Sequence, residues 1–105
     1  MELLFKLIIG HAVADFALQS DAMAKGKNSN IPRDNIQSPN WRYWLLSHSL
    51  IHAGVVWLIT GNVIYAFVEL LCHYAIDMIK CDRHINSHED QILHILCKIL
   101  YCITL

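Results

Sequence analysis

The sequence WLLSHSLIHAGVVWLI, residues 44–59, decides which fold this chain can adopt. Its second half, from Ala53 to Ile59, contains no charged residue, amide or hydroxyl, so a helix formed there has no face that suits water. Its first half carries His48 and His52, which are four residues apart and therefore share one face of a helix. The stretch predicts a helix with an apolar exterior and imidazoles on its inner face.

Three more apolar windows accompany this one, at residues 3–18, 63–79 and 92–105. The 105-residue chain is 55% hydrophobic and 16% charged, with a mean hydropathy of +0.37, whereas soluble domains carry about a quarter charged residues. With short polar flanks, each window approaches the roughly 20 apolar residues that cross a bilayer as a helix. The sequence predicts an all-α fold, a four-helix transmembrane bundle. It forms a single membrane-embedded domain over 1–105, with helices at about 2–19, 42–60, 62–80 and 88–105.

Two other interpretations of the apolar windows are open. One is a soluble four-helix bundle with a wide apolar face, which the segment from Val63 to Val68 disfavours because it offers no polar face. The other is a secretory signal in the first window. His11 and Asp15 interrupt that window and no obvious small-residue cleavage site precedes Ser20, so we expect residues 1–19 to be retained.

The basic residues predict an orientation for the helices. They gather in and beside the first and third connections, whereas the turn at 60–62 has none: Lys25, Lys27, Arg33, Arg42, Lys80 and Arg83. These two connections of a four-span chain lie on the same side of the membrane. The positive-inside rule therefore places the long first loop, 20–40, in the cytoplasm and both termini outside, in a multi-pass protein of the inner membrane.

Each apolar window carries, within it or across its start, two ligand-type side chains four residues apart. The pairs are His11/Asp15, His48/His52, His73/Asp77 and Asp90/His94. At a rise of about 1.5 Å per residue, every pair falls in the half of its helix nearest the predicted cytoplasmic loops. Ionisable groups inside a membrane generally face the bundle interior and mark function. The eight side chains are therefore predicted to converge on one polar, His/Asp-lined core.

Imidazole and carboxylate without thiolate suit a divalent metal, with zinc favoured and manganese or iron as alternatives. All eight residues are candidate metal ligands, and Asp15 or Asp90 is the candidate proton acceptor for catalysis. Gln19, Gln91 and Glu69 are candidates for holding ligands or substrate.

Structural roles compete with this hypothesis. The polar groups could simply hydrogen-bond one another, for example His48 with Asp77 and His11 with Asp90, and so join the helices. Ser87 followed by Asp90 also resembles a helix cap. Glu69 is expected to pair with Lys98 or Lys6, and the polar segment that holds His84 and His88 is expected to be solvated.

Four segments resemble, in order, the motifs of a known family. Residues 10–19, GHAVADFALQ, resemble an H-xxx-DF-xx-Q opening, and residues 48–53, HSLIHA, resemble an H-x-L-I-H-A segment. Residues 73–77 and 90–94 are similar to H-xx-I-D and DQ-xx-H segments. These are motifs of a membrane family of bacteria and phages catalogued as domain of unknown function 3307. The resemblance implies a small multispanning membrane protein without an established activity.

The residue chemistry supports three hypotheses for function. The first is a metal-dependent hydrolase, in which the metal activates water against an anionic, lipid-like or membrane-associated substrate beneath the basic loop. The second is a non-enzymatic proton, ion or metal pathway in a homo-oligomer. The third is an accessory protein that binds a host membrane protein. The expected surroundings are the lipid bilayer, and no nucleic-acid partner is expected because the basic residues suit a membrane surface better.

Overall fold

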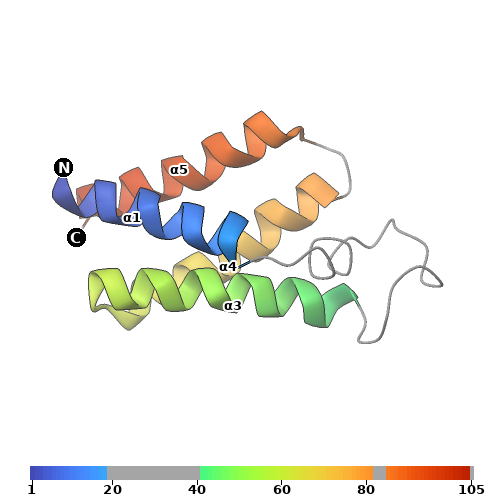
Figure 1. Cartoon of the computed structure of the whole chain (residues 1–105), viewed down its shortest axis with the longest axis horizontal. Coiled ribbons are helices and arrows are strands. Elements are labelled where there is room, and N and C mark those ends of the chain that lie inside the picture. The colour runs from blue at the N-terminus through green and yellow to red at the C-terminus, as the bar shows by residue number, and fades with distance from the viewer. Residues whose placement is uncertain (19–40, 82–84, 105) are drawn as a thin grey trace.

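A computed structural model of the chain describes residues 1–18, 41–81 and 85–104 (Figure 1). Within these ranges the chain forms four helices and no strand. They are α1 (Glu2–Ala12) with its continuation, the π-helix η1 (Val13–Ala17), then α3 (Trp41–Thr60), α4 (Val63–Cys81) and α5 (Ser87–Thr104). The prediction of an all-α, four-helix fold is confirmed. Gln19, the first connection and His84 lie outside the described residues.

The helices run side by side as an antiparallel bundle (Figure 1). The N-terminus, the C-terminal end of α5 and the α3–α4 turn share one end of the bundle. The end of α4 and the starts of α3 and α5 share the other, and η1 ends partway toward it. α3, with 20 residues, is about 30 Å long at the rise of an α-helix. We call the end of the bundle that holds both termini the terminal end, and the opposite end the connection end.

The turn between α3 and α4 is fixed by two adjacent residues. Gly61 has a φ of 68°, a left-handed conformation that glycine adopts without steric cost, and its N–H donates to the Trp57 carbonyl at 2.8 Å. The Asn62 side-chain oxygen then accepts a hydrogen bond from the Ile64 N–H at 2.9 Å. One residue thus closes α3 and the next caps α4.

The start of α5 differs from the sequence-based expectation. The capping residue is Asn86, whose Oδ1 accepts from the Glu89 N–H at 2.8 Å, while the Asn86 N–H donates to Glu89 Oε1 at 3.1 Å. This reciprocal pair replaces the predicted cap between Ser87 and Asp90. Because Glu89 serves the cap, Asp90 is left to point into the bundle, where it is buried.

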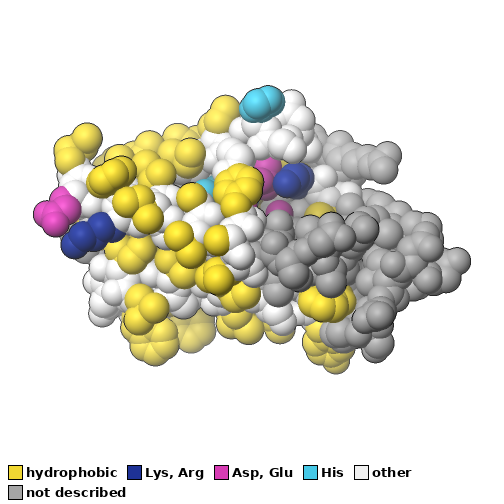
Figure 2. All heavy atoms as spheres, viewed as in Figure 1, with side chains coloured by type: hydrophobic (Ala, Val, Ile, Leu, Met, Phe, Trp, Pro, Cys, Tyr) yellow, Lys and Arg dark blue, Asp and Glu magenta, His cyan; other side chains and the backbone are white. Residues whose placement is uncertain are grey.

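The bundle has its polar side chains inside and many of its apolar ones outside. Large hydrophobic residues on every helix are strongly exposed, with Phe16 at 70%, Leu58 at 88% and Ile103 at 73%. Figure 2 shows apolar side chains spread over the visible face. The buried polar and charged residues are His11, His48, Ser49, His52, Glu69, His73, Asp77, Asp90, His94 and Lys98. A soluble bundle shows the opposite distribution.

Among the described helices, one segment, Arg42–Thr60 in α3, is long and apolar enough to cross a membrane by length and composition. That finding alone is weak evidence, and the four-span prediction is not confirmed. The reason lies in the charged residues of the other helices: α4 carries Glu69, Asp77 and Lys80, and α5 carries charged residues at 89, 90 and 98. α1 is shorter than a span and ends where the π-helix begins.

Close contact between α1 and α3 depends on a glycine. A Cβ added to Gly10 would lie 2.6 Å from Val55 Cγ1 and 2.8 Å from Ile59 Cδ1, well inside van der Waals contact. Val55 is β-branched, so its side chain has little freedom to move away. Gly10 therefore lets α1 approach α3 next to His11 and, one turn later, Asp15.

We expect Gly10→Ala to lower the free energy of unfolding by roughly 1–3 kcal/mol, the usual cost of overpacking, although alanine favours a helix over glycine. Gly54→Ala in α3 is the matched control, because a Cβ there would meet nothing within 4 Å. Denaturant unfolding in detergent, followed by circular dichroism, measures both. Equal stability of the two variants would show that α1 is not packed as described.

Candidate metal centre

The π-helix η1 carries Asp15 into the core. The Leu18 N–H donates to the Val13 carbonyl five residues earlier, at 2.9 Å, which is the hydrogen bond that defines a wide turn. Such turns often occur at functional sites. Asp15 lies within this turn and is the least buried acid of the core, with 11% of its side chain exposed.

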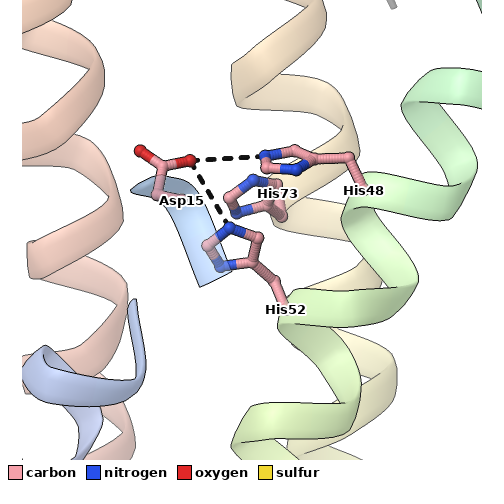
Figure 3. Close-up of side chains that lie close together, drawn as sticks. All are labelled: Asp15, His48, His52 and His73. Atoms are coloured by element: carbon pink, nitrogen blue, oxygen red, sulfur yellow. Dashed lines mark ion pairs between the residues drawn. The ribbon is translucent and has the colours of Figure 1, made fainter. Parts of the chain in front are cut away.

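Asp15 meets three histidines from two other helices (Figure 3). Asp15 Oδ1 lies 3.3 Å from His48 Nε2 and 3.4 Å from His52 Nε2, both on α3. His73 of α4 completes the group, and one ligand atom from each of the four residues lies within 4.8 Å of the others. We call Asp15, His48, His52 and His73 the first donor group.

The distances in this group suit a shared ion better than direct hydrogen bonds. Nitrogen-to-oxygen hydrogen bonds in proteins span about 2.7–3.2 Å, and within the described residues Nε2 of His48 and Nε2 of His52 have no hydrogen-bond partner. Ligands about 2.05 Å from a tetrahedral zinc are about 3.3 Å apart, by geometry from zinc–ligand bond lengths. The contacts at 3.3 and 3.4 Å match that separation.

Gln91 of α5 contacts the Asp15 carboxylate oxygen that does not face His48 and His52. Its amide nitrogen donates to Asp15 Oδ2 at 2.9 Å and also lies 3.3 Å from Asp90 Oδ2. Its Oε1 lies 3.0 Å from His11 Nε2. Hydrogen bonds of this kind orient ligands in metal sites, which is one of the two roles predicted for Gln91.

The same contacts determine which tautomer the neutral His11 ring adopts. Carboxylates accept hydrogen bonds, so the Gln91 NH2 group must face Asp15 and Asp90, and Oε1 must face His11. His11 Nε2 is then the donor. In the neutral ring Nδ1 keeps a lone pair, and this buried atom has no hydrogen-bond partner in the described part of the chain.

His11, Asp77, Asp90 and His94 lie outside the first donor group. Asp77, Asp90 and His94 form a second donor group with ligand atoms within 4.8 Å of one another. His73 connects the two groups, because its ring lies 3.7 Å from that of His52 and 4.2 Å from that of His94, centroid to centroid, stacked in both cases. The His11 ring lies 5.2 Å from both His52 and His94 and belongs to neither group.

The pairings proposed for a purely structural core are largely absent from the described residues. His48 Nε2 is 3.8 Å from Asp77 Oδ2, which is too long for a hydrogen bond. His11 bonds Gln91 and not Asp90. Neither of these two predicted pairings is present as a hydrogen bond in the described residues.

Glu69 extends the polar core toward the terminal end. Lys98 Nζ donates to Glu69 Oε1 at 2.7 Å, and the Tyr101 hydroxyl donates to the same oxygen at 3.0 Å. Glu69 Oε2 lies 3.3 Å from His73 Nδ1. Glu69 thus pairs with Lys98, as expected, and also contacts the site, while Lys6 is exposed and pairs with Glu2.

Lys98 and Tyr101 were missed as part of the core. Lys98 is 1% exposed, although a lysine near a helix end is expected to extend toward the surface. Its spacing was the available signal, because Asp90, His94 and Lys98 follow one another at four-residue intervals along α5. Glu69, His73 and Asp77 do the same along α4.

Beyond Lys98 the core becomes apolar. Leu7, Val56 and Tyr101 form a buried hydrophobic cluster, with Leu3, Ile59 and Tyr65 packed against it. The polar core is therefore closed toward the terminal end by packed side chains. Its least buried members, Asp15 and Lys80, mark the side toward the connection end.

A family model described as "Protein of unknown function (DUF3307)" matches residues 3–105. The chain belongs to this family. The four sequence motifs thus identified the DUF3307 family correctly, while its bacterial, phage and membrane character stays a prediction. Neither a curated protein nor a solved structure matched this DUF3307 chain.

Proposed function

We propose that this DUF3307 protein is a membrane-embedded zinc protein that hydrolyses an anionic, amphiphilic substrate. The observation that carries the proposal is the approach of one Asp15 oxygen to Nε2 of both His48 and His52, at distances that fit a tetrahedral ion. His73 supplies a fourth ligand or leaves that position to water. Three histidines and a carboxylate favour zinc over manganese or iron.

The membrane part of the proposal is supported by the distribution of side chains. Burying the acids and imidazoles while exposing residues such as Phe16, Leu58 and Leu71 suits a surrounding of lipid. In that setting the basic residues at the connection end, Arg42 and Lys80, would face the cytoplasm and both termini the opposite side.

A bound zinc ion would lower the pKa of its water and polarise a phosphoryl oxygen. The protein's own contribution is the proton acceptor, for which His11 Nδ1 is suited because Gln91 occupies the other ring nitrogen. In the proposed reaction the water would form a bond to phosphorus while its proton passes to His11 Nδ1, the ester P–O bond would break, and the protonated His11 would return the proton to the leaving alcohol. Asp15 and Asp90 were the predicted acceptors, but both already face imidazoles and Gln91.

Lys80 favours an anionic substrate. Its Nζ lies 3.9 Å from Asp90 Oδ2, and 36% of its side chain is exposed. It is therefore close enough to the donor groups to attract a phosphate and accessible enough to meet one. An amphiphile would place its apolar part along the exposed hydrophobic residues of the helices.

The pathway hypothesis is less well supported. A cation crossing the bundle would have to pass the buried Lys98 ammonium and then the cluster of Leu7, Val56 and Tyr101. Charge repulsion and packed apolar side chains both oppose that passage. The accessory-protein hypothesis stays a prediction, since the 20–40 loop on which it depends lies outside the described residues.

Purified wild type incubated with Zn²⁺ and then desalted should retain zinc, and His48→Ala or His52→Ala should each retain about one equivalent per chain less, because a ligand is lost. His88→Ala, an exposed histidine of α5, is the control and should match wild type. Elemental analysis gives the ratio. Zinc-free wild type, or unchanged zinc in His52→Ala, would contradict the site.

The protein should sediment with membranes and stay there after washing with alkaline carbonate, because its exposed apolar surface requires lipid or detergent. Immunoblotting of the fractions measures this. A C-terminal alkaline phosphatase fusion should be active, as expected for a terminus outside the cytoplasm. Recovery of the untagged chain in the soluble fraction would argue for a soluble bundle.

Zinc-loaded protein should release inorganic phosphate from phosphatidic acid in mixed micelles. His11→Ala should keep its zinc and lose about 100-fold or more in rate, the usual contribution of a general base, with His88→Ala as the unaffected control. A phosphate assay and elemental analysis of the same samples provide the two readouts. No release above that of free Zn²⁺ would refute hydrolysis of this ester, and loss of zinc in His11→Ala would make His11 a ligand.

A further inference from the structure

We propose that Asp77, Asp90 and His94 bind a second divalent cation beside the first, so that the core holds a two-metal centre. The inference rests on the proposed function and specifies the site further. It explains why the core holds more ligand-type side chains than a single tetrahedral ion uses.

The second donor group has the same local geometry as the first. Asp90 Oδ1 lies 3.2 Å from His94 Nε2, close to the separation of two ligands on one ion. Both residues are 1% exposed. Neither atom has a hydrogen-bond partner among the residues that the structure describes, and a buried polar atom in that condition is costly unless a ligand compensates it.

The other oxygen of Asp90 is already engaged. Oδ2 accepts from the Gln91 amide at 3.3 Å and lies 3.9 Å from Lys80 Nζ. The carboxylate is thereby held with Oδ1 facing His94. Asp15 is held in the same way, with Oδ2 on Gln91 and Oδ1 facing His48 and His52. One amide group thus orients one carboxylate of each donor group.

The two groups share a boundary. Asp77 Oδ2 of the second group lies 3.8 Å from His48 Nε2 of the first. The His73 ring of the first group stacks on the His94 ring of the second. This places the groups next to each other, as in two-metal hydrolytic centres, where the ions are about 3.5–4 Å apart.

Charge also favours two cations. In the described part of the chain the core holds the carboxylates of Asp15, Glu69, Asp77 and Asp90 and one buried ammonium, that of Lys98, which pairs with Glu69. Asp15, Asp77 and Asp90 together carry three formal negative charges, of which one divalent cation would compensate two. A second divalent cation would give the centre a slight positive charge, and Lys80 would increase that charge. A phosphate group would neutralise it. The second group has more oxygen ligands than the first and so also suits manganese.

The test is zinc stoichiometry after incubation with excess Zn²⁺ and desalting. Wild type should hold two equivalents per chain, and Asp90→Asn and His94→Gln should hold one. His52→Gln should also hold one, because it removes only the first site. His88→Gln, on the same helix as His94 but exposed, should hold two. Zinc X-ray absorption should show a metal neighbour in wild type and none in Asp90→Asn.

The outcomes separate the second site from the first. One equivalent in wild type, unchanged in His94→Gln and lost in His52→Gln, overturns the second site and leaves the proposed function standing. No zinc in wild type overturns both. Two equivalents in wild type and in both second-site variants place the extra ion elsewhere and overturn the inference. Circular dichroism checks that each variant is folded, and Asp77→Asn replaces any variant that is not.

Discussion

The structure depends on one constraint: four carboxylates and five imidazoles are enclosed by helices whose outer surfaces are largely apolar. An ionised side chain at the centre of a membrane helix costs roughly 2.5–3.5 kcal/mol even on insertion scales. The bundle offers compensation in two forms. At the terminal end Lys98 and Tyr101 satisfy one oxygen of Glu69, whereas toward the connection end the acids face imidazoles whose nitrogens lack hydrogen-bond partners in the described chain. One oxygen of Glu69 is thus compensated by hydrogen bonds within the protein, whereas the cations that we propose would compensate the acids toward the connection end.

Much of the fold could be predicted from the sequence because helical periodicity and turn residues are local signals. The apolar windows, the turn at Gly61 and Asn62 and the four-residue spacing of ligand-type side chains gave the number of helices and their inner faces. The membrane interpretation is harder to test from hydropathy, since Glu69, Asp77 and Lys98 lower the average of their helices even though they face inward. Average hydropathy cannot distinguish a charge in the core from a charge on the surface.

The site was less predictable, because its details depend on contacts between helices. Spacing grouped eight residues as one layer, but it could not show that Gln91 takes His11 as a partner and so separates that ring from the donor groups. Nor could it show the π-helix, which alters the path of the backbone at Asp15. Lys98 was one of two lysines expected to pair with Glu69, and it does so. The four-residue spacing from Asp90 and His94 indicates only the face of Lys98, however, and its complete burial follows from the packing of α4 against α5.

The neighbouring acids Glu89 and Asp90 have separate roles at the start of α5. From the sequence, Asp90 was a candidate both for capping the helix and for binding a metal in the core. Glu89 and Asn86 close the first turn of α5 on the exposed side, and Asp90 faces the core. The side-chain hydrogen bonds that cap the helix therefore do not use the Asp90 carboxylate. If Asp90 binds a cation as we propose, the ion would be able to enter or leave without breaking the cap of α5, so the empty and filled forms would share one backbone and access to the core, not refolding of the helix, would govern exchange.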